Sequence, residues 1–278
     1  MSFSFIMSGV IAISIVFIIC IIAFVKMRDI SLPMKFNMVT NHIKNGNYRS
    51  AVKLCKDIIA KDPKNPEAHY FMGLAYLNDN QNELALDEFR IVDRTGITSK
   101  NINEHELRIH MAELYTKTNK IEEALKEYAL LAQKKANDFE VYFKMGELFD
   151  LKGNKQQAAA YYMKTLQIKK RHVPALYKLG LIYFDFKKYA DAKKLFTLLK
   201  AENPNDWKVY YYLGVIDKNE GNAKSAIANL EKATRDKELK VKALAERGMV
   251  YATAGKHELA VIEFERALNN LNGESQNF

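Results

Sequence analysis

The sequence predicts an all-α protein in which about seven pairs of helices stack into a solenoid that follows one membrane-spanning helix in the chain. Two observations lead to this prediction: the same residue types return every 34 positions, and an uncharged apolar stretch lies near the amino terminus. The composition agrees with both. Of the 278 residues 48% are apolar, enough for a sizeable core, and 12 glycines and 5 prolines are too few for a low-complexity chain.

The amino-terminal 25 residues contain no charged side chain, and residues 6–25 form an apolar run of 20 residues. At about 1.5 Å per residue, a helix of this length crosses a hydrocarbon core of about 30 Å. A cleaved signal peptide would carry basic residues before the run, and none is present. Cys20 follows Ile19, where lipidation needs a small residue, so we interpret Cys20 as an ordinary helix residue. Residues 1–31 are therefore predicted to be a membrane anchor with a short linker.

Flanking charge predicts which side of the membrane the rest of the chain occupies. No Lys or Arg precedes the apolar run, whereas Lys26, Arg28 and Lys35 follow it within 10 residues. Because basic residues favour the cytoplasmic side, the remainder of the chain is expected in the cytoplasm.

The period of 34 residues is clearest at three sets of positions. Each set keeps one kind of side chain: glycine, alanine, or a large and mostly aromatic residue. The members are Gly146, Gly180, Gly214 and Gly248; Ala124, Ala158, Ala192, Ala226 and Ala260; and Tyr128, Tyr162, Phe196, Leu230 and Phe264. A short unit that cannot bury its apolar face alone must stack on its neighbours, so the period predicts a solenoid.

This pattern resembles the tetratricopeptide repeat, in which a small residue, an alanine and an aromatic residue recur within each pair of antiparallel helices. Gly73, Tyr76, Ala85 and Phe89 show it within one repeat. The resemblance implies a right-handed α-solenoid over residues 32–274 and leaves a tail at 275–278. The repeats are expected at 32–65, 66–99, 105–138, 139–172, 173–206, 207–240 and 241–274, with five extra residues before 105.

Each part of the repeat has an expected packing role. The small residue lets the two helices approach closely, and the large residue fills the space between stacked repeats. Pro63 and Pro204 are expected to end helices. Three positions depart from the pattern, which leaves the packing around them open: Val39 replaces a small residue, Asp217 an aromatic residue and Arg247 a leucine.

No motif for catalysis is present: the sequence lacks a phosphate-binding loop, a serine-nucleophile elbow and closely spaced cysteines. His105, Glu106 and His110 approach the zinc-protease pattern, but one extra residue places the imidazoles about 140° apart around a helix. Solvated helix histidines are the expected interpretation. Two cysteines, Cys20 and Cys55, cannot build a disulfide scaffold. We therefore expect an interaction scaffold with no catalytic residue, no cofactor and no metal.

The concave groove of the predicted solenoid is the expected binding site for other proteins, which would contribute a peptide or a helix. The groove residues are apolar and aromatic at both ends and acidic in the middle. They are Phe36, Tyr70, Glu113, Phe143, Glu147, Asp150, Tyr177 and Tyr211. We expect a peptide with apolar anchors on either side of a basic residue. The alternative is that the aromatic row is ordinary repeat packing.

A basic block lies at residues 151–200, which carry 12 Lys and Arg against two Asp. It would dock an acidic protein or anionic lipid headgroups, and the alternative is a solvated lysine-rich face. No nucleic-acid-binding motif accompanies the block, so nucleic acid is not an expected partner. The candidate docking residues are Lys164, Lys169, Lys170, Arg171, Lys187, Lys188, Lys193 and Lys194.

One anchor followed by such repeats is similar to two groups of bacterial inner-membrane proteins. Regulators of lipopolysaccharide assembly end in a four-cysteine metal module, which is missing because no cysteine follows Cys55. Tetratricopeptide proteins of the periplasmic collar around the spirochaete flagellar motor would have their repeats on the other side of the membrane. The leading hypothesis is a scaffold that assembles or stabilises a multiprotein complex. The alternatives are a collar component and an adaptor or regulator of envelope assembly or proteolysis.

The last predicted repeat indicates self-association. Its second helix carries Val261, Phe264 and Leu268, and only a short polar segment follows. The apolar face of this helix is therefore expected to pack against a second copy or a partner.

Overall fold

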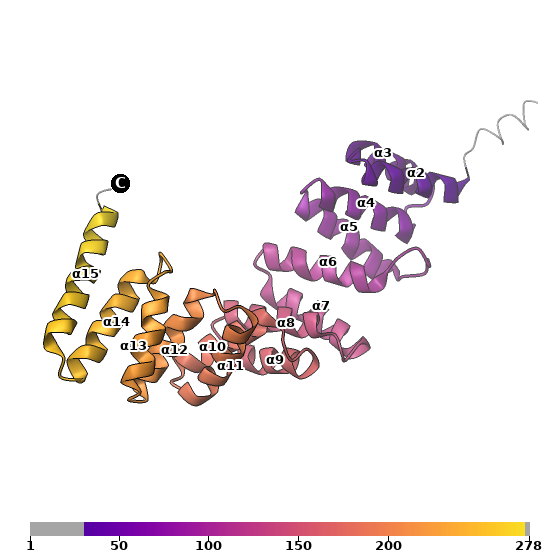
Figure 1. Cartoon of the computed structure of the whole chain (residues 1–278). Coiled ribbons are helices and arrows are strands. Elements are labelled where there is room, and N and C mark those ends of the chain that lie inside the picture. Colours follow the sequence, from indigo (N-terminus) through magenta and orange to yellow (C-terminus); the bar gives the residue numbers. More distant parts are fainter. Residues whose placement is uncertain (1–30, 276–278) are drawn as a thin grey trace, which may run out of the picture. The chain divides into compact units, whose positions relative to one another are not determined.

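The computed structural model describes residues 31–275, and this part of the chain contains 14 α-helices and no strand (Figure 1). The prediction of an all-α repeat fold is confirmed. The described residues fall into two compact units that divide after Asn119. The predicted membrane anchor at residues 6–25 lies outside the described residues, and within them no helix has the length and apolar character that a membrane span needs.

The first unit is built from helices that alternate along the chain with short turns. Its capping chemistry explains where helices begin: Asn65 accepts a hydrogen bond of 2.9 Å from the backbone N–H of Ala68, and Pro66 occupies the first turn of its helix. The helices are α2 (Leu32–Lys44), α3 (Tyr48–Ile59), α4 (Pro66–Asn78), α5 (Asn82–Thr95) and α6 (Glu104–Lys117).

The extra residues before position 105 form an ordered connection between α5 and α6. Ser99 donates a hydrogen bond of 2.8 Å to Glu67, and Asn101 donates one of 2.7 Å to the same carboxylate. Ile102 is buried. The insertion is therefore fixed against the start of α4.

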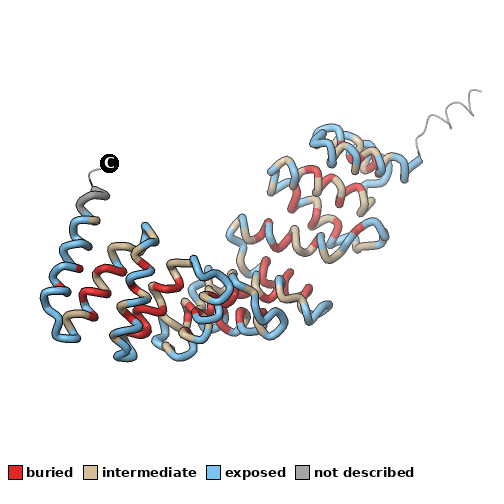
Figure 2. Tube along the Cα trace, in the orientation of Figure 1, coloured by how far each residue is buried: buried red, intermediate tan, exposed pale blue. Residues whose placement is uncertain are grey.

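The second unit repeats the same helix pairing. The side chains of Asp138, Asn154, His172 and Asp206 cap four of its helices at their N-termini. The helices are α7 (Ile121–Lys134), α8 (Phe139–Leu151), α9 (Lys155–Ile168), α10 (Val173–Asp185), α11 (Tyr189–Glu202), α12 (Trp207–Asn219), α13 (Ala223–Ala233), α14 (Lys240–Thr253) and α15 (His257–Ser275). In Figure 2 the buried residues of these helices lie mainly where each helix faces its neighbours.

A glycine on the first helix of a pair touches the large side chain of the second. A Cβ added to Gly146 would lie 2.6 Å from Cε1 of Tyr162, and one added to Gly73 would lie 2.5 Å from Cε1 of Phe89. No real Cβ comes this close, so only glycine permits the observed approach. The large residue therefore packs first within its own repeat, which refines the prediction that it fills the space between repeats.

The same large residues also reach the next repeat. The ring of Phe196 on α11 stacks on Tyr212 of α12, with ring centroids 5.0 Å apart. In the first unit, Phe89 stacks on His110 at 5.9 Å. One side chain thus joins three helices, which makes each repeat dependent on its neighbour.

The three departures from the repeat pattern are accommodated in the core. Val39 is fully buried, and its apolar side chain needs no hydrogen-bond partner. Asp217 is buried and lies 2.7 Å from Nζ of Lys193, and it accepts a second hydrogen bond from Asn229. Arg247 is buried and donates to Glu263 at 2.9 Å. The two buried charges are therefore paired, as burial requires.

The clearance at two equivalent glycines predicts different responses to alanine. A Cβ at Gly180 would lie 3.1 Å from Phe196, compared with 2.6 Å from Tyr162 at Gly146. Overpacking costs about 1–3 kcal/mol, which at Gly146 exceeds the gain in helix propensity of up to about 1 kcal/mol. We expect Gly146→Ala to lower the free energy of unfolding by about 1–2 kcal/mol, and Gly180→Ala to change it by less than about 0.5 kcal/mol. Urea denaturation of both variants measures this, and equal effects would contradict the packing argument.

Candidate partner-binding site

Several of the predicted groove residues lie on one face of the second unit. We define the first-helix face as the side of α8, α10, α12 and α14 that carries Phe143, Glu147, Asp150, Tyr177, Leu181, Tyr211, Val215 and Met249. Side chains of successive helices meet across it. Asp150 of α8 lies 3.5 Å from Nζ of Lys178 on α10, and Lys218 of α12 lies 2.5 Å from Glu246 on α14.

An aromatic cluster occupies the middle of this face. Tyr212 is surrounded by Phe184 at 5.2 Å, Tyr211 at 5.4 Å and Tyr177 at 6.3 Å, measured between ring centroids and all edge to face. The four residues are only half-buried. Burial raises the pKa of Tyr177, Tyr211 and Tyr212, so their hydroxyls stay neutral at physiological pH. The aromatic cluster can therefore offer both apolar area and hydrogen bonds.

Two lysines that the sequence pattern did not indicate accompany the predicted acidic centre. Glu147 accepts a hydrogen bond of 2.9 Å from Lys144, and Asp150 pairs with Lys178. Both carboxylates remain partly exposed. Glu113 lies on α6 of the first unit and is exposed. The two acidic residues of the second unit are therefore close to neutralised by their surroundings.

The two groove residues predicted nearest the amino terminus belong to the core of the first unit. Phe36 is 6% exposed and its ring lies 5.6 Å from that of Phe71. Tyr70 is 3% exposed and donates a hydrogen bond of 3.5 Å to Glu106. Burial and this carboxylate raise the pKa of Tyr70 to about 12. Neither ring offers a partner much surface, which favours ordinary repeat packing at these two positions.

Most candidate docking residues of the basic block have partners within the second unit. Lys193 pairs with Asp217 and Glu220, Lys194 with Asp191, and Arg171 with Glu202. Lys164 lies over Tyr142, Lys169 over Phe139 and Lys188 over Tyr183, at 4.2–5.8 Å from the ring centroids. Lys170 and Lys187 are exposed. The block is therefore not a uniform cationic surface.

The histidines do not form a metal site. No group of three or more His, Cys, Asp or Glu residues within residues 31–275 could hold an ion. The prediction of a solvated histidine is wrong for His110, because its ring is half-buried against Phe89. Burial lowers its pKa and keeps it neutral at pH 7. His110 is half-buried because it lies on the side of α6 that faces Phe89 of α5.

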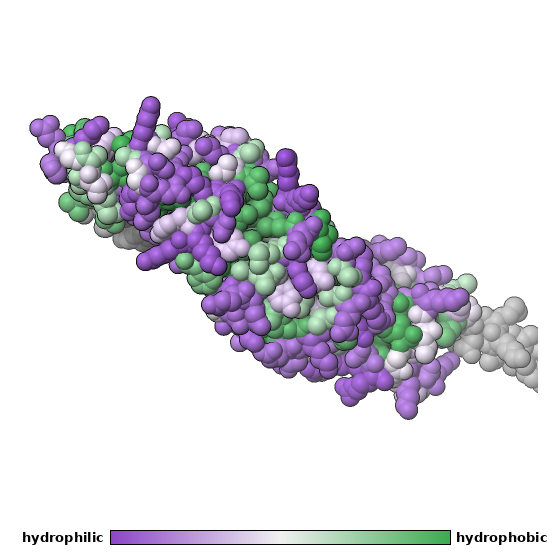
Figure 3. Space-filling model, turned by 90° about the horizontal axis from the view of Figure 1, so that it is seen from below, coloured by the Kyte–Doolittle hydropathy of each residue, from purple (hydrophilic) through white to green (hydrophobic). Residues whose placement is uncertain are grey.

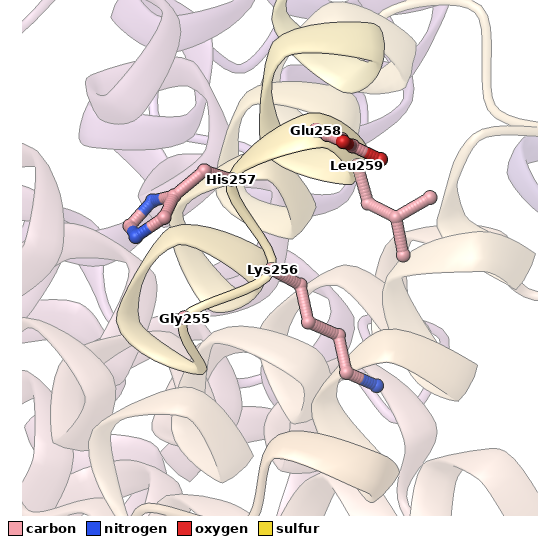
Figure 4. A pocket seen from close by; sticks show the side chains of 5 residues that line it. All are labelled: Gly255, Lys256, His257, Glu258 and Leu259. Carbon is pink, nitrogen blue, oxygen red and sulfur yellow. The ribbon is translucent and has the colours of Figure 1, made fainter.

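A surface depression lies at the turn between α14 and α15. Its lining residues are Gly255, Lys256, His257, Glu258 and Leu259. Figure 4 shows that the side chains of Lys256, His257 and Leu259 point in different directions. These side chains therefore do not converge on one point.

Other apolar side chains also reach the surface, and Figure 3 shows hydrophobic residues exposed among hydrophilic ones. In the second unit Met249 on α14 is 40% exposed and Leu198 on α11 is 46% exposed. On α15 the exposed fractions are 54% for Val261, 41% for Phe264 and 57% for Leu268. Exposed apolar side chains thus occur on a first helix, α14, on a second helix, α11, and on α15.

Antiparallel helix pairs in phase with a 34-residue period define a helical-repeat protein. Models of the tetratricopeptide repeat match residues 42–94, 139–172, 174–206 and 219–275, which together are more than half of the chain. The chain belongs to the tetratricopeptide repeat proteins.

Three of the solved structures with the same fold can be compared by sequence identity, TM-score, and the shares of this chain and of their own chain that the match covers. A protein from Cytophaga hutchinsonii is 18% identical, with a TM-score of 0.67, over 85% of this chain and 99% of its own. MamA from Desulfovibrio magneticus RS-1 is 22% identical, with a TM-score of 0.56, over 62% and 97%. YrrB, described as having an unusual peptide-binding site, is 17% identical, with a TM-score of 0.56, over 67% and 93%. A comparison with curated proteins found no match.

Proposed function

We propose that this protein is a non-catalytic, membrane-anchored scaffold that binds segments of partner proteins on its first-helix face. In this way it would assemble or stabilise a multiprotein complex at a bacterial inner membrane. The observation that carries the proposal is the aromatic cluster of Tyr177, Phe184, Tyr211 and Tyr212, which is half-buried on rigid helices. The peptide-binding site described for YrrB, a structure of the same fold, supports this kind of activity.

The aromatic cluster suits a peptide's apolar anchor for two physical reasons. Aromatic rings supply a large contact area with few rotatable bonds, so little side-chain entropy is lost on binding. The rings also hold each other edge to face, which fixes their positions before a partner arrives. A bound segment would pack an apolar side chain against the exposed edges of these rings.

Binding to a displayed random-peptide library tests the location of the site. We expect peptides selected on the full chain to lose about tenfold in affinity when Tyr211 is replaced by Ala, as a binding hot spot does. Tyr183→Ala is the matched control, because Tyr183 is half-buried on α10 but donates to Met163 on α9. Equal losses in the two variants, or none in either, would reject this face as the site and leave the basic block as the better candidate.

The membrane anchor is proposed for residues 6–25 on the basis of their length and lack of charge. Flanking charge favours cytoplasmic repeats. A periplasmic location would favour the alternative of a structural component in the collar of a spirochaete flagellar motor. A role as adaptor or regulator of envelope assembly or proteolysis is compatible with either side.

Membrane fractionation and cysteine labelling test the anchor and its orientation. The mature protein is expected to keep its amino terminus and to sediment with membranes. Lys170→Cys, in a chain whose Cys20 and Cys55 are replaced by Ala, should resist an impermeant thiol reagent in intact spheroplasts and react after lysis. Labelling before lysis would reverse the orientation, and a soluble chain beginning after residue 25 would remove the anchor.

Self-association through α15 is proposed as a second mode of assembly. Phe196 is fully buried, where the first helix of the next pair packs on it, whereas Phe264 at the same repeat position is 41% exposed. Val261 and Leu268 extend this apolar stripe by one turn on either side. We propose that the stripe pairs with that of a second copy.

Replacing Phe264 by Asp places a charge in the stripe and should shift the detergent-extracted protein from dimer to monomer in light-scattering measurements. Leu198→Asp, at a comparably exposed apolar position on α11, is the control and should leave the mass unchanged. A protein that is monomeric before any substitution would contradict the second copy as the occupant.

A further inference from the structure

The hydroxyl of Tyr162 is a buried polar group without a partner. The side chain is 0% exposed, and its Oη forms no hydrogen bond within the described residues. The three later pairs of the second unit have Phe196, Leu230 and Phe264 at the same repeat position, so packing does not require a hydroxyl. An unsatisfied buried hydroxyl costs about 1–3 kcal/mol, which makes its presence unusual.

The ring of Tyr162 packs against the part of α8 that carries two acidic residues. The edge of the ring lies across Gly146, where an added Cβ would be 2.6 Å from Cε1 and 3.2 Å from Cζ, the atom that bears the hydroxyl. Glu147 follows Gly146 directly, and Asp150 is about one turn further along the helix. Burial and both carboxylates raise the pKa of Tyr162, so the phenol stays protonated in their electrostatic reach.

We propose that Glu147, Asp150 and the hydroxyl of Tyr162 form a subsite for the guanidinium group of an arginine in a bound peptide. This inference rests on the proposed function and specifies its ligand. A guanidinium group has five N–H donors in one plane and no acceptor, which matches two carboxylates and a hydroxyl oxygen. The hydroxyl of Tyr162 would accept a hydrogen bond from one N–H of the guanidinium group and donate one to a carboxylate. It would then no longer lack a hydrogen-bond partner.

The lysines that now neutralise the two carboxylates are weak competitors. Lys144 pairs with Glu147 on the same helix and Lys178 lies 3.5 Å from Asp150, and their side chains are 49% and 42% exposed. Exposed pairs of this kind contribute about 0–1 kcal/mol. A planar, bidentate guanidinium group forms stronger charge-assisted hydrogen bonds, so it can displace both ammonium groups into solvent.

The surroundings of the subsite favour a planar cation. The ring of Phe143 lies 5.6 Å from that of Tyr162 and offers a surface on which guanidinium stacks. His172 packs edge-on against Phe143 at 4.8 Å. Burial, together with Lys169, lowers the pKa of His172, so it is neutral at pH 7 and adds no repulsive charge.

The subsite is linked to the aromatic cluster through α10, which carries both Tyr177 and Lys178, the partner of Asp150. A single extended segment can therefore reach both. The specific ligand is a peptide in which an arginine lies next to an apolar or aromatic residue.

The test uses one peptide selected on the full chain and synthesised with arginine, lysine or norleucine at its most conserved basic position. We expect the arginine peptide to bind about tenfold more tightly than the norleucine peptide, with lysine in between. Tyr162→Phe should weaken the arginine peptide about fivefold and leave the norleucine peptide unchanged. Glu147→Gln should remove most of the preference for arginine.

Tyr128→Phe is the matched control, since it deletes a hydroxyl at the same repeat position of α7 and should leave all three affinities unchanged. If Tyr162→Phe has no effect, or if arginine and norleucine bind equally, the proposal is wrong and a buried water satisfies the hydroxyl. Failure of the proposed function gives a different result: either no peptide is selected, or the selected peptides are insensitive to Tyr211→Ala. The subsite proposal is then rejected together with the proposed function.

Discussion

The close contact between a glycine on one helix and a large side chain on the next determines how the helix pairs that carry this glycine are built. At Gly146 and Tyr162 the ring occupies the volume that any side chain on the first helix would need. The second helix is thereby held close, and its large residue extends to the following pair, as Phe196 does to Tyr212. Tyr177 and Tyr211 on the first helices lie at the edge of this packing and stay half-buried.

This geometry also explains where polar groups can be accommodated. Asp217 and Arg247 replace apolar residues of the repeat, and each is buried with an oppositely charged partner from a neighbouring helix. Tyr162 differs from both, because its ring fulfils the packing role while its hydroxyl has no partner within the described residues. The proposed arginine subsite would supply the partner that folding alone does not give this hydroxyl.

Much of the fold could be predicted from the sequence, because a 34-residue period is carried by residues whose size is fixed by packing. The site was less accessible. Phe36 and Tyr211 occupy equivalent repeat positions, yet Phe36 is buried against Phe71 and Tyr211 is half-exposed, a difference set by neighbouring helices. The ion pairs of Lys193 and Lys178 likewise depend on residues about 25–30 positions away, which charge counting within a segment does not reveal.

If partners bind the first-helix face, site-specific crosslinking in cells will capture them there. A photoreactive amino acid would replace either Met249 on the first-helix face or Leu198 on a second helix, since both side chains are similarly exposed at 40% and 46%. We expect a crosslinked partner from position 249 and none from position 198. Crosslinking from position 198 alone would contradict binding on the first-helix face.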